Sequence, residues 1–100
     1  MIEYRGETFK DYNVAKLTPR HPSKKAAVLA RVTKNGKTII KLIRFGDQGS
    51  GHNYSDEARE RFKARFAKLI AKKDKLSPTF WADKFLWTKG GIVRRPPKER

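Results

Sequence analysis

The dipeptide Asn35-Gly36 constrains the fold more strongly than any other feature of this 100-residue chain. It separates two runs that are rich in β-branched and other apolar residues. Asn and Gly both tolerate the positive φ that the central residues of a type I′ turn require, so the pattern predicts a β-hairpin with a two-residue loop. Such a loop pairs Lys34 with Lys37, and this pair fixes the register of the whole hairpin.

Side chains alternate between the two faces of a strand, so the register also predicts which residues share a face. We expect one apolar face to pack against a helix, and it consists of Val28, Val32, Ile39, Ile43 and Phe45. The opposite face carries Leu29, Arg31, Ile40, Leu42 and Arg44. This second face is too apolar to be fully solvated. Either the N-terminal segment partly covers it, or it is itself a contact surface.

An amphipathic helix is predicted over residues 55–73. Ser55 is suited to be its N-cap, and Asp56 and Glu57 lie in the first turn, where the helix dipole favours negative charge. At about 100° per residue, one apolar arc runs along this helix and should face the core. Its members are Ala58, Phe62, Phe66, Leu69 and Ile70.

The same helix carries a basic stripe, which we expect on the side away from the core. Its members are spaced at i, i+4, i+7 and i+11, and they are Arg61, Arg65, Lys68 and Lys72. Charge runs of this kind are usually solvated faces that nearby carboxylates balance, here Glu57 and Glu60. Only Glu57 lies near the arc of the stripe, so we expect the stripe to contact a polyanion.

A second helix should begin at Ser77-Pro78, because serine is a favoured N-cap and proline is favoured at the first helical position. It should end by Gly90-Gly91. Its large apolar residues are Phe80, Trp81, Phe85, Leu86 and Trp87. We expect most of them in the core. The alternative is an exposed tryptophan that stacks on a base or fills a pocket of a partner.

Together these elements predict a small single α+β domain, in which an antiparallel β-hairpin packs against two C-terminal helices. Residues 26–88 should form this core. Residues 1–25 should form an N-terminal arm with a basic loop over 18–25, and a short strand near residues 2–4 is a candidate third strand. Residues 89–100 should form a basic tail, extended because of Pro96-Pro97.

The chain carries 25 Lys and Arg against 10 Asp and Glu, a formal net charge of +15. Both halves of the chain share this excess, so the folded surface itself should be basic. Such a field attracts phosphate backbones, anionic headgroups and acidic protein surfaces. Outside the helix stripe, the predicted phosphate contacts are Arg20, Lys24, Lys25, Arg94 and Arg95. For the loop that contains the first three, the alternative is a solvated connector.

Several classes of site lack their sequence signals. The chain has no cysteine, which excludes disulfides, thiolate nucleophiles and zinc-finger ligands. The glycines that follow Phe45 have neither Walker A nor G-x-G-x-x-G spacing, so a flexible turn is the better interpretation. With histidine only at positions 21 and 52, we predict no catalytic residue, no metal site and no cofactor. No apolar run suits a signal peptide or a membrane span, so we expect a soluble protein without membrane contact.

Four short motifs follow one another within residues 13–88: Phe45-Gly46-x-x-Gly49, Arg59-x-x-Phe62-x-x-Arg65, Ser77-x-x-Phe80-Trp81-Ala82 and Leu86-Trp87. In this order the chain resembles a family of small basic proteins encoded by tailed bacteriophages, with looser relatives in large eukaryotic DNA viruses. Many phage members have His where this chain has Phe66, and a longer insertion after the glycine motif. The resemblance implies a viral origin, hence a location in the host cytoplasm or nucleoid, or in the virion. It carries over no catalytic residue.

We therefore expect a non-enzymatic viral protein that binds DNA or RNA mainly through phosphate contacts. Two alternatives would use the same basic surface. One is a factor that captures an acidic surface of a host protein, such as its transcription machinery, with Trp81 or Trp87 as an aromatic anchor. The other is a minor virion component between the packaged genome and the shell. No pattern in the chain fixes an oligomeric state.

Overall fold

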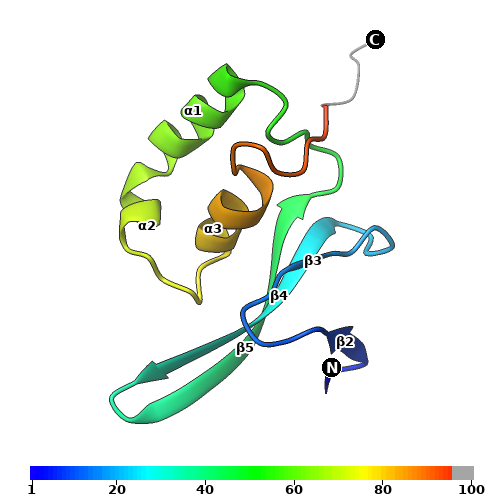
Figure 1. The fold of residues 1–100 in the computed structure, drawn as a ribbon, viewed down its shortest axis with the longest axis vertical. Helices are drawn as coiled ribbons and strands as arrows, with labels where there is room; N and C mark the ends of the chain where they lie inside the picture. Colours follow the sequence, from blue (N-terminus) through cyan, green and yellow to red (C-terminus); the bar gives the residue numbers. More distant parts are fainter. Residues whose placement is uncertain (96–100) are drawn as a thin grey trace.

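The structure is a computed structural model that describes residues 1–95, and it confirms a small α+β domain (Figure 1). Its strands form two antiparallel sheets. The first sheet pairs β1 (Ile2–Tyr4) with β2 (Glu7–Phe9), and the second has the order β3 (Lys16–Leu17), β4 (Lys24–Lys34) and β5 (Lys37–Asp47). The helices follow as α1 (Asp56–Arg65), α2 (Ala67–Ala71), α3 (Pro78–Trp81) and the π-helical turn η1 (Ala82–Leu86).

The central hairpin has the predicted turn and register. Asn35 and Gly36 have φ of 51° and 76°, as a type I′ turn requires. Lys34 is paired with Lys37, and the same register continues along both strands to the pair of Lys24 with Asp47. The boundary expected at residue 26 therefore falls inside β4, because this strand begins two residues earlier.

The main core lies on the face of the hairpin that was expected to be apolar. Val28, Ile43 and Phe45 are buried there against Trp81 and Leu86. In Figure 1, α3 lies between the sheet and the pair α1–α2, so the second predicted helix covers the hairpin directly. The first predicted helix packs farther out, and of its apolar arc Phe62 packs against this core.

The N-terminal segment partly covers the opposite face of the hairpin, where Ile40 stays exposed, and this favours the first of the two alternatives. Phe9 is buried against Ala27 and Leu29, and Tyr12 and Leu42 pack around them. The predicted strand at residues 2–4 exists, but it pairs with β2 and not with the hairpin. The third strand of the hairpin sheet is β3 instead.

The prediction of one continuous helix over residues 55–73 is wrong. Its start is confirmed, because the Ala58 N–H donates to Ser55 Oγ at 3.0 Å, but α1 ends at Phe66 with φ −108° and ψ 18°. A short α2 follows and packs against α3, and Lys73 has a positive φ of 50°. The helix propensity of residues 55–73 contributes less to the free energy of folding than the packing of α2 against α3, so the helix is interrupted.

Among residues 1–95, no helix combines the length and the apolar character that a membrane span needs.

Candidate nucleic-acid interface

Four aromatic rings form a continuous series beside α1, and we call them the aromatic row: Tyr54, Trp87, Phe62 and Phe66. Tyr54 and Trp87 have ring centroids 6.4 Å apart. Trp87 and Phe62 are stacked at 4.8 Å with planes only 10° apart, and Phe62 lies 5.0 Å from Phe66. All four residues are half-buried, so each of them keeps part of its surface exposed.

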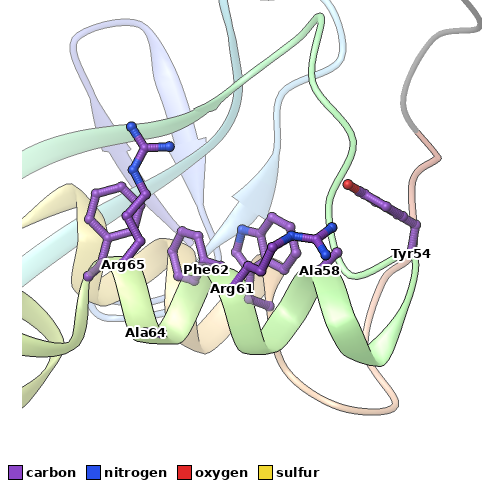
Figure 2. A pocket seen from close by; sticks show the side chains of 8 residues that line it. Tyr54, Ala58, Arg61, Phe62, Ala64 and Arg65 are labelled. Atoms are coloured by element: carbon purple, nitrogen blue, oxygen red, sulfur yellow. The ribbon is translucent and has the colours of Figure 1, made fainter.

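A cavity of about 530 Å³ opens along the aromatic row. The row lines it together with Arg61, Arg65 and two small residues, Ala58 and Ala64 (Figure 2). No carboxylate contributes to this lining. Within residues 1–95, neither Arg61 nor Arg65 forms an ion pair, and the Arg65 guanidinium lies 5.3 Å from the centroid of the Phe66 ring. The cavity is therefore an apolar groove with a positively charged edge, and we call it the aromatic–arginine groove.

The expected separation between the basic stripe and the apolar arc is wrong. Figure 2 shows the side chains of Arg61, Phe62 and Arg65 rising from the same side of α1. Each arginine directly precedes a phenylalanine in the sequence, so only about 100° separates the two around the helix. This angle places the arginines along the edge of the aromatic row rather than opposite to it.

The other two members of the stripe do not join this groove. Lys68 is exposed on α2, beyond the helix break. Lys72 is the C-cap of α2 and lines a separate surface hollow with Lys34 and Lys75. The break at Phe66 therefore divides the predicted stripe into an arginine pair at the groove and two lysines on and after α2, of which Lys72 lies near the turn end of the hairpin.

A second cavity, of about 360 Å³, lies next to the first and shares part of the aromatic row and Arg65 with it. Lys25 and His52 form part of its wall and are almost completely buried, with 3% and 2% of their surface exposed. Lys25 Nζ donates to the Ser50 carbonyl oxygen at 2.5 Å and lies 3.0 Å from His52 Nδ1. The prediction that Lys25 belongs to an exposed basic loop is thus wrong.

The protonation of this buried pair follows from its geometry. The Lys25 ammonium has only donors, so His52 Nδ1 accepts and the neutral ring carries its proton on Nε2. Nε2 is buried and has no hydrogen-bond partner among the described residues. Burial, with smaller effects from the charges of Lys25 and Arg94, lowers the pKa of His52 to about 4. Burial and Arg94 lower the pKa of Lys25 to about 8, and Asp47 partly opposes them. At neutral pH, His52 is therefore neutral and Lys25 is mostly charged.

Gly46 makes room for the buried lysine. Its φ is +75°, and a Cβ there would lie 2.7 Å from Lys25 Cγ and 2.7 Å from Leu86 Cδ1. Only glycine combines this backbone conformation with such a close approach. The glycine-rich segment over residues 46–54 was expected to be a flexible turn, but its first glycine lies within β5 and is a packing position between this strand and η1.

The remaining predicted contact residues lie outside the groove. Arg20 and Arg95 are exposed, and Lys24 pairs with Asp47 at 3.3 Å. Arg94 forms a backbone bridge with His52, with hydrogen bonds of 2.8 and 3.0 Å, and its side chain donates to Gln48 Oε1 at 3.3 Å. The predicted basic tail is therefore attached to the domain at Arg94. Residues 96–100 lie outside the described residues.

The groove combines residues that sequence reasoning treated separately. Trp87 was expected in the core, with an exposed stacking or anchoring tryptophan as the alternative, and Arg61 was expected in a stripe away from the core that contacts a polyanion. Tyr54 received no role, yet all three line one cavity. The signal in the sequence was the repeat Arg61-Phe62 and Arg65-Phe66. Its spacing of four residues places the two arginines next to the two phenylalanines along one side of the helix. Within residues 1–95, no group of three or more His, Asp or Glu side chains could hold a metal ion.

Comparison of the chain with known protein families, with curated protein sequences and with solved structures finds no match. The resemblance to the phage proteins therefore stays a prediction.

Proposed function

We propose that this protein binds nucleic acid without catalysing a reaction, and that the aromatic–arginine groove is the centre of the interface. The carrying observation is the pair Arg61 and Arg65, which have no ion-pair partner within residues 1–95 and line an aromatic cavity without a carboxylate. Guanidinium groups bind phosphate oxygens through two parallel hydrogen bonds, so such a pair suits a sugar–phosphate backbone.

The rest of the surface supports the same proposal through its charge. With a net charge of +15, the protein attracts polyanions from a distance and adds contacts that do not depend on sequence. Exposed cations outside the groove, including Arg20, Lys68, Lys72 and Arg95, would contribute to this weaker binding. The resemblance to phage proteins supports placing this activity in an infected host cell or in a virion.

Fluorescence anisotropy with labelled DNA and RNA oligonucleotides across a salt series tests the proposal. If five or six phosphates are contacted, the slope of log K against log salt should be about −5 for duplex DNA. The double charge reversal Arg61→Glu/Arg65→Glu should weaken binding at least about tenfold at low salt, because two charge-assisted contacts are lost. Absence of binding to any nucleic acid at about 50 mM salt would reject the proposal.

A matched control separates the groove from the overall charge. The double reversal Lys34→Glu/Lys37→Glu changes the net charge equally, at exposed residues that flank the hairpin turn. It should weaken binding much less than the arginine reversal. Equal losses would show that the groove is not the centre of the interface. If a stoichiometric host protein instead binds the groove after nuclease treatment of a lysate, the acidic protein surface becomes the better candidate partner.

A further inference from the structure

From the geometry of the groove we infer that this protein selects single-stranded nucleic acid and stacks unpaired bases along the aromatic row. The inference rests on the proposed function and adds a substrate class to it. Backbone contacts alone would not distinguish a single strand from a duplex in this way, because both present phosphates.

The first argument is the arrangement of the rings. A hydrophobic core covers its aromatic side chains on all sides, whereas Tyr54, Phe62, Phe66 and Trp87 are half-buried and border an open cavity. Trp87 and Phe62 stack on each other at 4.8 Å, so an unpaired base can stack only on the ring faces that this pair leaves and on the tilted rings of Phe66 and Tyr54 at either end of the row. Proteins that bind single strands without strict sequence preference use aromatic surfaces of this kind, because every base has a π-face.

The second argument is the chemistry of the edge. Arg61 and Arg65 precede the two phenylalanines of the row by one residue each, so a positive charge stands beside each ring. A strand whose bases lie on the rings would carry its phosphates past these guanidinium groups. The cavity volume of about 530 Å³ lies in the range of pockets that bind small organic groups.

The third argument is exclusion of the paired form. In a duplex, the flat faces of the bases are stacked inside the helix and are not available to the rings of the row. A duplex could contact Arg61 and Arg65 only through its backbone, and its bases would not contact the aromatic rings of the groove. The base-stacking contribution, about fivefold or more in affinity for each base, is therefore available only to an unpaired strand.

Three probes of equal phosphate number test the inference with the intact protein: a thymidine oligonucleotide, an abasic oligonucleotide of the same length, and a duplex. In anisotropy measurements at one salt concentration, the affinity for the thymidine strand should exceed the affinity for the abasic strand at least about fivefold, because the abasic strand keeps the charge and lacks the bases. The thymidine strand should also quench tryptophan fluorescence, since Trp87 lies in the row.

Two variants locate the effect. Phe66→Leu keeps an apolar side chain but removes one ring of the row, so it should reduce binding of the thymidine strand by a larger factor than binding of the abasic strand. Phe80→Leu is the matched control, because Phe80 is a half-buried aromatic residue that lines neither cavity. Circular dichroism and thermal melting of both variants check that they fold.

The outcomes separate the inference from the proposed function. Equal affinities for all three probes with a steep salt dependence would overturn base stacking and leave phosphate binding in place. A preference for the thymidine strand that Phe80→Leu removes as strongly as Phe66→Leu would overturn the assignment to this groove. Failure to bind any probe at low salt would reject the proposed function itself.

Discussion

Replacement of His52 by asparagine should reduce the loss of stability that the protein suffers in mild acid. His52 is buried beside two cations, Lys25 and Arg94, and these surroundings hold its pKa at about 4, against 6.5 for a solvated histidine. An asparagine at this position can still accept a hydrogen bond from Lys25, because its side-chain oxygen is an acceptor, and it does not titrate. The substitution therefore removes the proton-binding group with a small change in packing.

The size of the effect follows from proton linkage. Between about pH 6.5 and pH 4 the unfolded chain binds a proton at His52 and the folded protein does not, so the free energy of unfolding falls as the pH falls. The complete effect is about 3 kcal/mol, and about 2 kcal/mol of it should develop between about pH 7.5 and pH 5. For a chain of 100 residues this is a substantial part of the total stability.

Urea denaturation followed by tryptophan fluorescence measures the difference. The wild type should lose about 2 kcal/mol more than His52→Asn between these two pH values, since the contributions of all other titrating groups cancel in the comparison. Nuclear magnetic resonance of the His52 ring protons should independently give a midpoint near pH 4 in the folded state. Equal losses in the two proteins, or a midpoint near 6.5, would refute the assignment of a buried neutral imidazole held beside Lys25.

Three further changes test the packing around the groove by urea denaturation. Gly46→Ala should cost about 2–4 kcal/mol, because alanine is strained at positive φ and its Cβ would collide with two buried side chains; a loss below about 1 kcal/mol would contradict this. Ser55→Ala should cost about 1 kcal/mol through loss of the N-cap bond, and Ser55→Asp should retain most of the stability. Lys63→Met should cost about 1–3 kcal/mol, because it leaves the buried carboxylate of Asp83 without its partner at 2.5 Å. Lys89→Met, at an exposed position, should change the stability by less than about 0.5 kcal/mol.

Local signals predicted the hairpin well. The turn at Asn35-Gly36 depends on backbone conformations that few residue types allow, and the turn then determines every pair along both strands. The apolar face that this register implies is the one that packs against Trp81 and Leu86. In both cases the determining residues are adjacent in sequence or directly paired, so periodicity was sufficient.

The N-terminal pairing was missed, because its turn carries a weaker sequence signal than Asn35-Gly36. Arg5 and Gly6 have φ of 48° and 81°, so β1 and β2 are joined by a second turn with two positive φ values. Arginine gives no signal for this conformation, in contrast to asparagine. Only Gly6 indicated the turn, and a single glycine does not distinguish a hairpin from a loop.

The interface could not be predicted from periodicity because its parts come from three separate segments. Trp87 follows η1, Phe62 belongs to α1, and Tyr54 lies in the connection between the sheet and α1. Their positions depend on how α1 packs against η1 and Trp87 and on the helix break at Phe66, and both are properties of tertiary packing. The burial of Lys25 likewise depends on the space that Gly46 leaves beside Leu86. The sequence alone does not show that these three residues are neighbours.

The most direct test of the central claim maps the bound strand on the protein by nuclear magnetic resonance. In a titration of the isotope-labelled protein with a thymidine oligonucleotide, we predict the largest shift changes at the Trp87 indole, at Tyr54 and along Arg61 to Phe66. The largest changes at the hairpin turn, with the resonances of the groove unchanged, would contradict the claim that the aromatic–arginine groove binds nucleic acid.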